Sequence, residues 1–448
     1  MSSATLTRRL AGFALDPAYR RLPDDVAHAV RRAMLDSLGV AVAGARHEAT
    51  KIAATMVTRL GAGGECRLIG SAQRTDPVNA ALLNGIAAHV LDWDDTILPT
   101  RAHLSAALLP ALFALGEREG WTLDDIVPAF AVGFELQARM NSAVYPAIHL
   151  RGWQGTGIVG GVGTAAAAAR MLSFDADRTC HAMGLAATNA SGLIATFGSM
   201  AKPLNIGRAG ASGLQSALLA ALGYTSHADI LGAGRFLELY DEAPRHDLLV
   251  EGLGWDWAIL RNGYKPYPCG FVAHAMIDAV RDLRARTGAA RPLTRLDLRL
   301  STESTQLMGN ADPRNELEAK FSLVYEAAVA WIDGHVTPAA FEPAAVRDPR
   351  YRSVMALTHI VSSHEVAQHE AFVEAAFADG AVERLHVAHA RGTPARPLTD
   401  GDLLEKFVAA LTLGGIAGGE RLGTMILSEP RVPIATLMDR LSFAVGER

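Results

Sequence analysis

Runs of small apolar residues at helical spacing dominate this chain and constrain its fold more than any other feature. From Pro23 to Arg284, apolar residues recur every three or four positions, which is typical of helices that bury one face. The runs Gly163–Leu172 and Gly213–Leu222 are apolar nearly all round, as in helices at the centre of a large bundle. One stripe, predicted to end near Gly39, contains Val26, Val30, Met34, Leu35 and Leu38. The sequence therefore predicts a mainly α fold with closely packed central helices.

A different pattern begins after Pro292. Alternating or strand-like character is found in three segments, Leu296–Ser301, His359–Ser362 and Val382–His389. Helices are predicted over 317–332 and 401–413, the second of them after Thr399 as its N-cap. Because 448 residues are many for one hydrophobic core, we expect a second domain of mixed α+β structure in this part of the chain.

The composition excludes several classes of protein. Hydrophobic residues make up 50% of the chain and charged residues 20%, and the net charge of -5 comes without a basic patch for nucleic acid. The N-terminal segment lacks the apolar core of a signal peptide, and no apolar stretch has the length of a membrane span. Cys66, Cys180 and Cys269 form no C-x-x-C pair, so no disulfide, zinc or iron–sulfur motif is visible. We expect a cytoplasmic globular protein without nucleic-acid or membrane partners.

The first segment that indicates chemistry is acidic. An apolar helix runs into Asp92-Trp93-Asp94-Asp95-Thr96, and His103 follows closely. Three carboxylates within four positions repel one another, so a helix end or a cation must compensate, and one raised pKa would make a general base. Solvated aspartates at a capped helix end are the simpler alternative. Oxygen ligation of Mg²⁺ by Asp94 and Asp95 is a weaker one.

Two later segments add lysines. In Ala201–Ala211, Lys202 and Arg208 flank glycines at a predicted turn, where backbone amides would approach an anion such as a carboxylate. A plain surface turn is the alternative. In Tyr264–His274, two prolines fix the backbone around Lys265, which suits a catalytic lysine, although an interdomain hinge would also use them.

Together with Arg151–Gly157, these three segments resemble the MmgE/PrpD family, whose members include 2-methylcitrate dehydratase, cis-aconitate decarboxylase and iminodisuccinate epimerase. The resemblance covers nearly the whole chain. Further matching segments are Leu22–Pro23, Leu35–Gly39, Ala319–Tyr325 and Glu405–Phe407.

The resemblance implies a large all-helical domain built from residues 1–265 and 398–448, with a smaller α+β domain inserted at 266–397. It also implies an active site between the two domains and a homodimer that works without a metal or other cofactor. The residues expected to be catalytic are Asp92, His103, Tyr145 and Lys265. Those expected to bind substrate are Thr96, Gln154, Lys202, Arg208 and His274.

Two positions depart from the common family pattern. Gln154 and Asn205 stand where many members carry His. An amide can hydrogen-bond a carboxylate but cannot transfer protons near neutral pH as imidazole does. If either His protonates a leaving hydroxyl in other members, this chain does not perform ordinary dehydration in that way.

Our hypothesis is a lyase that acts on a small di- or tricarboxylate through a proton alpha to a carboxylate, like 2-methylcitrate dehydratase or aconitate decarboxylase. Lys202 and Arg208 would hold carboxylates, while Lys265 with Tyr145 or Asp92 exchanges the proton. His103 is the candidate acid for a leaving group.

Two alternatives stay open. An epimerase of a dicarboxylate such as iminodisuccinate needs two opposed proton carriers and no leaving group. A non-catalytic helical binding protein would keep the fold without the chemistry, which fold resemblance does not exclude.

Overall fold

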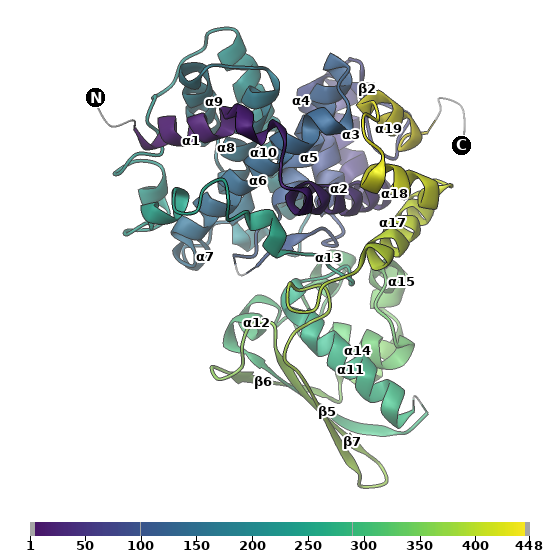
Figure 1. Ribbon diagram of the computed structural model, residues 1–448. Helices are drawn as coiled ribbons and strands as arrows, with labels where there is room; N and C mark the ends of the chain where they lie inside the picture. Colours follow the sequence, from purple (N-terminus) through teal and green to yellow (C-terminus); the bar gives the residue numbers. More distant parts are fainter. Residues whose placement is uncertain (1–4, 99, 289, 444–448) are drawn as a thin grey trace.

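Helices make up most of the computed structural model, which describes residues 5–98, 100–288 and 290–443. A large helical part contains the first and the last described segments of the chain, and a smaller part carries the main sheet (Figure 1). The predicted mainly α fold is therefore confirmed. None of the helices in the described ranges has the length and apolar character needed to cross a membrane.

The helical part is built around α10 (Ala201–Ala221), which packs against α4 (Pro77–His89), α5 (Leu104–Glu119), α8 (Gly155–Met171) and α9 (Ala176–Thr188). Around them lie α1 (Leu6–Leu15), α2 (Asp24–Gly44), α3 (Glu48–Arg59), α6 (Leu123–Val144), α7 (Ala147–Leu150), α17 (Asp400–Gly414), α18 (Gly419–Ser428) and α19 (Ile434–Arg440).

Helix α10 corrects one prediction. The segment after Ala201 is helical from its first residue and is not an anion-binding turn. Its glycines permit close helix packing instead, because a Cβ at Gly207 would lie 2.4 Å from the carbonyl oxygen of Leu82 and one at Gly210 would lie 2.2 Å from that of Ala107.

Helix α2 also differs from the prediction at its end. It continues past Gly39 to Gly44, because the glycine serves packing between helices rather than termination. A Cβ at Gly39 would lie 2.8 Å from a ring carbon of Phe407, which belongs to α17. Thr399 caps α17 as predicted, in a reciprocal pair of hydrogen bonds with Asp402.

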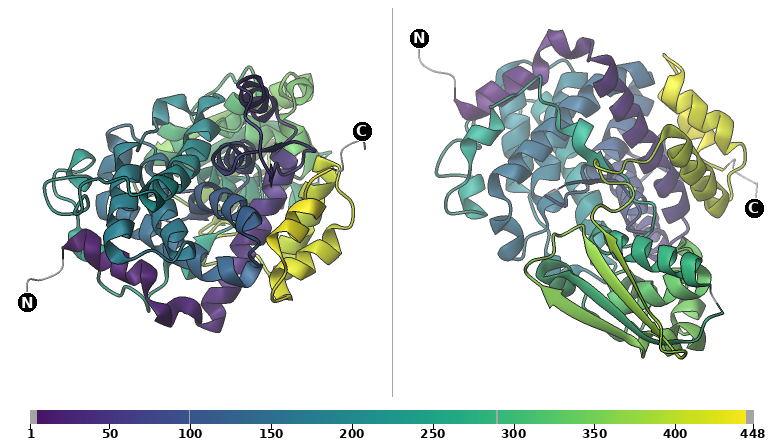
Figure 2. Two further views of the ribbon diagram at one scale, coloured as in Figure 1. Left: turned by 90° about the horizontal axis from the view of Figure 1, so that it is seen from above. Right: turned by 60° about the horizontal axis from the view of Figure 1, so that its bottom comes forward.

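The smaller part contains a four-stranded sheet in the order β6-β5-β7-β8. Its strands are β5 (Leu293–Ser301), β6 (Thr358–Ser363), β7 (Ala371–Phe377) and β8 (Val382–Val387). β5 pairs in parallel with β6 and antiparallel with β7, and β7 pairs antiparallel with β8. Helices α11 (His274–Thr287) and α14 (Leu323–Asp333) cover one face (Figure 2).

The three predicted strands are confirmed as parts of β5, β6 and β8, while β7 was not predicted. The predicted helix over 317–332 is wrong in its middle. It is divided into α13 (Glu316–Ala319) and α14, because Ser322 is in extended conformation and its side chain caps α14. The break places Lys320 outside both helices.

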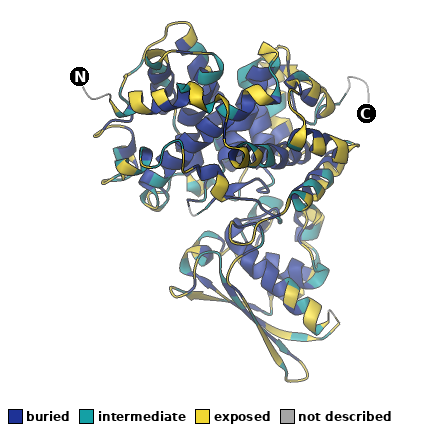
Figure 3. Cartoon of the chain, in the orientation of Figure 1, coloured by how far each residue is buried: buried dark blue, intermediate teal, exposed yellow. Residues whose placement is uncertain are grey.

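Two large hydrophobic cores lie in the described chain. One runs from Leu10 to Tyr264 and resumes at Leu398, and the other extends from Tyr267 to Ala390. The buried interior of each part is visible in Figure 3. The cores lie on the two sides of the expected boundaries at 265–266 and 397–398, and the domain division itself stays a prediction.

Two short antiparallel pairs complete the helical part. One joins β1 (Cys66–Arg67) to β2 (Arg74–Thr75). The other joins β3 (Thr96–Ile97) to β4 (Asn262–Gly263), with Thr96 opposite Gly263. This second pair brings the acidic segment and the Lys265 segment, far apart in sequence, into contact.

Substitution of Gly210 by Ala tests the role of glycine in α10. The added Cβ meets backbone of α5, which has no room to yield, so we expect a loss of about 1–3 kcal/mol in the free energy of unfolding. Gly12→Ala is the matched control, since Gly12 is exposed in α1 with nothing within 4 Å of its Cβ position. It should gain about 0.5–1 kcal/mol from helix propensity. Urea unfolding measures both, and equal effects would contradict the packing role.

Candidate active site

The acidic segment after α4 is buried, not solvated. Asp92, Asp94 and Asp95 are 3%, 0% and 0% exposed. The chain turns at Asp92, whose φ of 51° lies in the left-handed region that non-glycine residues rarely adopt. The alternative of a capped helix end with solvated aspartates is therefore wrong, because this segment lies between the two cores and needs internal partners for its charges.

Two lysines neutralise Asp92. The Nζ atoms of Lys202 and Lys265 lie 2.9 Å and 2.7 Å from the same carboxylate oxygen. Burial opposes the charge of Asp92, but the two ammonium groups hold the pKa of its carboxyl well below the usual range. Lys265 also donates to the Asp92 carbonyl oxygen at 2.9 Å. Two cations against one carboxylate leave an excess positive charge that favours an anionic ligand.

Two further lysines hold the backbone of the same segment. Lys320, at the break between α13 and α14, donates to the carbonyl oxygen of Leu91 at 3.0 Å. Lys406 of α17 donates to that of Trp93 at 2.6 Å and pairs with Asp36 at 2.6 Å. Burial lowers the pKa of Lys320 to about 8. Four lysines from four separate segments thus fix the short stretch 91–93.

Asp94 organises two histidines. Its Oδ2 lies 2.9 Å from Nδ1 of His89 and 3.1 Å from Nδ1 of His103. The Asp95 carbonyl oxygen also lies 3.2 Å from Nδ1 of His103, so acceptors surround this nitrogen and it carries the hydrogen. Burial disfavours the charge of Asp94, but both imidazoles lower the pKa of its carboxyl below the ordinary value.

His103 is neutral and faces the site with its other nitrogen. Burial lowers its pKa from the ordinary value, and the nearby ammonium groups of Lys265 and Lys202 act in the same direction. Nε2 makes no hydrogen bond to the described residues, and the ring lines a cavity. An imidazole held through Nδ1 by a carboxylate, with Nε2 open, is arranged to accept and return a proton.

Asp95 has the opposite protonation state. Burial, and then the charge of Asp36, raise the pKa of Asp95 to about 8. Its Oδ2 accepts hydrogen bonds from Ser105 and Asn262, both at 2.5 Å. The three neighbouring aspartates therefore avoid mutual repulsion because two have cationic or imidazole partners and the third keeps its proton.

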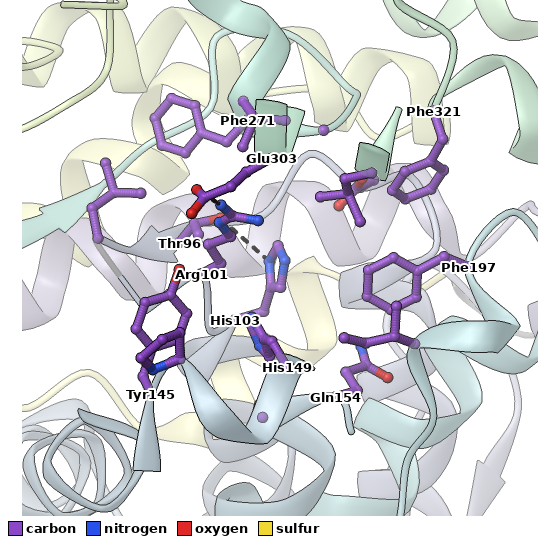
Figure 4. Close-up of a pocket in the computed structure, with 18 of the residues that line it drawn as sticks. Thr96, Arg101, His103, Tyr145, His149, Gln154, Phe197, Phe271, Glu303 and Phe321 are labelled. Atoms are coloured by element: carbon purple, nitrogen blue, oxygen red, sulfur yellow. Dashed lines mark hydrogen bonds and ion pairs between the residues drawn. The ribbon is translucent and has the colours of Figure 1, made fainter. Parts of the chain in front are cut away.

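The cavity that these residues border has a volume of about 270 Å³. In Figure 4, Phe197 and Phe321 lie on one side, Tyr145 and Arg101 lie on the other, and His103 is between them. The ammonium of Lys202 lies 5.2 Å from the centroid of each of the two phenylalanine rings, so the lysines belong to that side. Of the residues predicted to form the site, the cavity lining includes Asp92, Thr96, His103, Tyr145, Gln154, Lys202 and Lys265.

The two amides that depart from the family pattern contact each other. Asn205 Nδ2 donates to Gln154 Oε1 at 2.9 Å, and Gln154 lines the cavity while being only 4% exposed. Its Nε2 has no partner among the described residues, which leaves one donor for a ligand. Neither side chain transfers protons near neutral pH.

Two predicted site residues lie elsewhere. Arg208 is exposed on α10 and does not line the cavity, because the segment is a helix and the residue falls on its outer face. His274 is completely buried at the start of α11, against the rings of Tyr267 and Phe271. Tyr145 does line the cavity, and burial raises its pKa, which favours the protonated phenol over the phenolate.

Sequence reasoning missed several residues that border the site. Asp94 was considered only as part of an acidic run and, with Asp95, as a weaker Mg²⁺ ligand, although its closeness in sequence to His89 and His103 contained the signal. Arg101, His149 and His369 also line the cavity. His369 comes from the segment before β7, and no local pattern predicted that this segment reaches the site.

Four side chains near the cavity are of the types that bind metal ions. His89, Asp92, Asp94 and His103 bring four possible ligand atoms within 4.8 Å of one another. The ammonium groups of Lys202 and Lys265 already occupy one oxygen of Asp92, and they would repel a divalent cation at that position. The donor chemistry therefore fits proton transfer and anion binding better than metal ligation.

Comparison with known proteins covers most of the chain. The MmgE/PrpD N-terminal domain matches residues 8–240 and the MmgE/PrpD C-terminal domain matches residues 267–419. Cis-aconitate decarboxylase of Homo sapiens is 28% identical over 408 residues, 87% of this chain and 84% of the relative. The enzyme of the same name from Aspergillus terreus is 28% identical over 352 residues, 73% and 72% of the two chains. The cis-aconitate decarboxylase-like protein oryM of Aspergillus oryzae is 28% identical over 432 residues, 90% and 89% of the two.

The raised pKa of Asp95 predicts a pH dependence of stability. The folded protein keeps this proton up to about pH 8, whereas an unfolded aspartate loses it near pH 4, so folding binds a proton between these values. The contribution of Asp95 to the free energy of unfolding should therefore fall with rising pH in that window, by up to about 1.4 kcal/mol per unit. Buried histidines with lowered pKa values oppose this slope below about pH 6, so the contribution of Asp95 is measured above that pH. Asp95→Asn removes the titration and should flatten the slope between pH 6 and 8.

Urea unfolding at pH 6, 7 and 8 measures the slope. Glu383→Gln, at an exposed position of β8, is the control and should keep the slope of the unaltered protein. An unchanged slope in the Asp95→Asn variant would contradict the protonation state assigned to this residue.

Proposed function

The chain belongs to the MmgE/PrpD family, and on this basis we propose that it is a lyase that acts on a small di- or tricarboxylate through proton transfer at carbon. One observation carries the proposal. The ammonium groups of Lys202 and Lys265, both paired with Asp92, lie beside the same cavity as the imidazole of His103, which Asp94 holds in place. The ammonium groups supply anion binding and the imidazole supplies a proton carrier.

Lys202 and Lys265 bind a substrate carboxylate in this proposal. Their ammonium groups are fixed by Asp92, so they meet the ligand without first being ordered. Because they share one carboxylate, they retain the capacity to stabilise the negative charge that develops when a proton is lost next to a carboxylate. Lys265 donates two hydrogen bonds to Asp92. We therefore assign Lys265 to charge stabilisation, and we assign the proton transfer, which the sequence had suggested for Lys265, to His103.

In this proposal His103 transfers the proton through its Nε2 atom. Its hydrogen bond to Asp94 fixes the ring and favours the form with hydrogen on Nδ1. A polyanionic substrate beside the ring raises the pKa of the imidazole, so Nε2 is protonated more readily in the complex than in the free protein. The same atom then serves as a base that removes an α proton or as an acid that returns one.

Decarboxylation is the outcome that the relatives support, since those named above are cis-aconitate decarboxylases or resemble them. In loss of CO₂ from an unsaturated tricarboxylate, the C–C bond to the leaving carboxylate breaks and its electron pair forms a new double bond. The far carbon of the old double bond takes one proton, which we assign to Nε2 of His103. Thr96 and Gln154 complete the polar lining as hydrogen-bond partners.

Epimerisation of a dicarboxylate is the second candidate, and the contact between Gln154 and Asn205 favours it. This pair stands where proton-carrying imidazoles are common in the family, and it offers only hydrogen bonds. A reaction without a leaving group needs no further acid. His103 and Tyr145, both in the cavity lining, would be its two proton carriers.

His103→Gln should lower kcat by about 10²- to 10⁴-fold, the usual contribution of a general acid or base, with a smaller effect on KM. His386→Gln, at a half-exposed position of β8, is the matched control and should retain full activity. The measurement is turnover of cis-aconitate together with solvent-deuterium incorporation. Full deuterium incorporation by the His103→Gln variant would exclude His103 as the proton carrier.

Lys265→Met should abolish detectable binding of the substrate carboxylate and destabilise the protein, because Asp92 keeps only one of its two cations. Lys51→Met, at an exposed position of α3, is the control and should do neither. A thermal-shift titration with cis-aconitate measures both effects. An undiminished shift in the Lys265→Met variant would contradict the proposed anion site.

Proton NMR in deuterium oxide with cis-aconitate, 2-methylcitrate and iminodisuccinate separates the candidate reactions. New vinyl signals with loss of substrate mark a lyase, and exchange at an α carbon without net conversion marks an epimerase. Binding without either result would support the non-catalytic alternative and contradict both proposed reactions.

A further inference from the structure

Arg101 is a cavity residue that neither the motifs nor the proposed chemistry uses. It lies between β3 and α5, and its side chain lines the cavity near Thr96 and on the same side as Tyr145 (Figure 4). Its φ of 56° is in the left-handed region, so its backbone adopts a conformation that a residue with a side chain rarely takes. The guanidinium lies on the side of the cavity opposite Phe197 and Phe321, the two rings that Lys202 contacts.

The guanidinium contacts two side chains that the proposed chemistry does not use, the carboxylate of Glu303 and the amide of Gln368. Its Nη2 donates to Oε2 of Glu303 at 2.8 Å, and the Glu303 side chain is 66% exposed. Glu303 belongs to α12 (Thr302–Leu307), in the part of the chain with the main sheet. Ion pairs with such an exposed carboxylate contribute little to stability. A ligand carboxylate within the cavity would meet the same fork of donors with less solvent around it.

The remaining polar groups near Arg101 are neutral. Burial lowers the pKa of His149 and of His369 to about 4 each, with the charge of Arg101 acting in the same direction, and Tyr145 keeps its proton. Both ring nitrogens of His369 are buried without a partner among the described residues. Asp92 and Glu303 are the acidic residues of the described cavity lining. Asp92 already has two lysines, so Glu303 is the carboxylate that competes for Arg101.

We propose that Arg101 binds a second carboxylate of the substrate and exchanges Glu303 for it when the substrate enters. The inference rests on the proposed function, and it specifies the substrate class: a molecule with carboxylates at two ends, one at the lysines and one at Arg101. His103 lies between Arg101 and the rings of Phe197 and Phe321, which Lys202 contacts (Figure 4). The carbon that gains or loses a proton would lie beside His103. Arg101 is a specificity-determining residue in this arrangement, and Glu303 is its internal competitor.

The exchange predicts opposite effects of two substitutions. Arg101→Met should weaken binding of cis-aconitate and of citraconate by about 10- to 100-fold, the usual effect of losing a charged hydrogen-bond donor. Crotonate, which has one carboxylate, should bind both proteins equally. Glu303→Gln should tighten binding of cis-aconitate, because it removes the competing charge. Arg101→Lys keeps the charge without the planar fork and should give an intermediate loss.

Isothermal titration calorimetry with the full chain measures these dissociation constants. Arg299→Met is the control, because Arg299 also pairs with an exposed glutamate, Glu365, but lies outside the cavity. If the ion pair were purely structural, Arg101→Met and Glu303→Gln would weaken binding of cis-aconitate alike, and that result would overturn the proposal. Equal losses of affinity for crotonate and for cis-aconitate in the Arg101→Met variant would also overturn it. Should Arg101→Met fail to fold, the Arg101→Lys variant decides between the same outcomes.

Binding by the unaltered protein separates a wrong role for Arg101 from a wrong proposed function. If the unaltered protein binds and converts cis-aconitate and both Arg101 variants match it, Arg101 is not a substrate contact and the lysine site stands. If the unaltered protein binds none of the three acids, the proposed function fails first and the inference with it.

Discussion

Hydrogen bonds from lysine ammonium groups to the stretch Leu91–Trp93 are the interaction on which the site depends. This stretch turns through a left-handed residue between two cores, and its carbonyl oxygens need donors that neighbouring backbone does not provide. The four lysines come from α10, from the segment after β4, from the break before α14 and from α17. The site therefore forms only when both cores are in place, which couples its geometry to the whole fold.

The same contacts divide the acidic residues into different protonation states. Asp92 is ionised because two ammonium groups face it, and Asp94 is ionised because two imidazoles share one of its oxygens. Asp95 has only neutral donors, and burial keeps it protonated. Three carboxylates that would repel one another in water become a partner of two lysines, a partner of two imidazoles and a neutral hydrogen-bond acceptor. Packing thus assigns different chemistry to adjacent residues of one type.

Helix packing determines where the groups proposed to act in the site lie. Because Gly207 and Gly210 have no Cβ, the backbone of α10 packs directly against α4 and α5. This close packing positions Lys202, at the start of α10, against Asp92. The same helix presents Asn205 to Gln154 at the start of α8. The residues that make the fold compact are therefore on the same helix as residues that make the cavity polar.

The sequence by itself determined the helical character, three of the four strands of the main sheet and the cap of α17, and it singled out Asp92, His103, Lys202 and Lys265, which the structure brings to one cavity. These features are local, because periodicity, capping residues and charged clusters are written in neighbouring positions. Only the tertiary structure decided that Arg208 and His274 lie outside the cavity, that Arg101 and His369 line it, and that Asp94 supports His103. Such outcomes depend on which faces of distant elements meet, and burial and partner charges arise from that meeting rather than from local sequence.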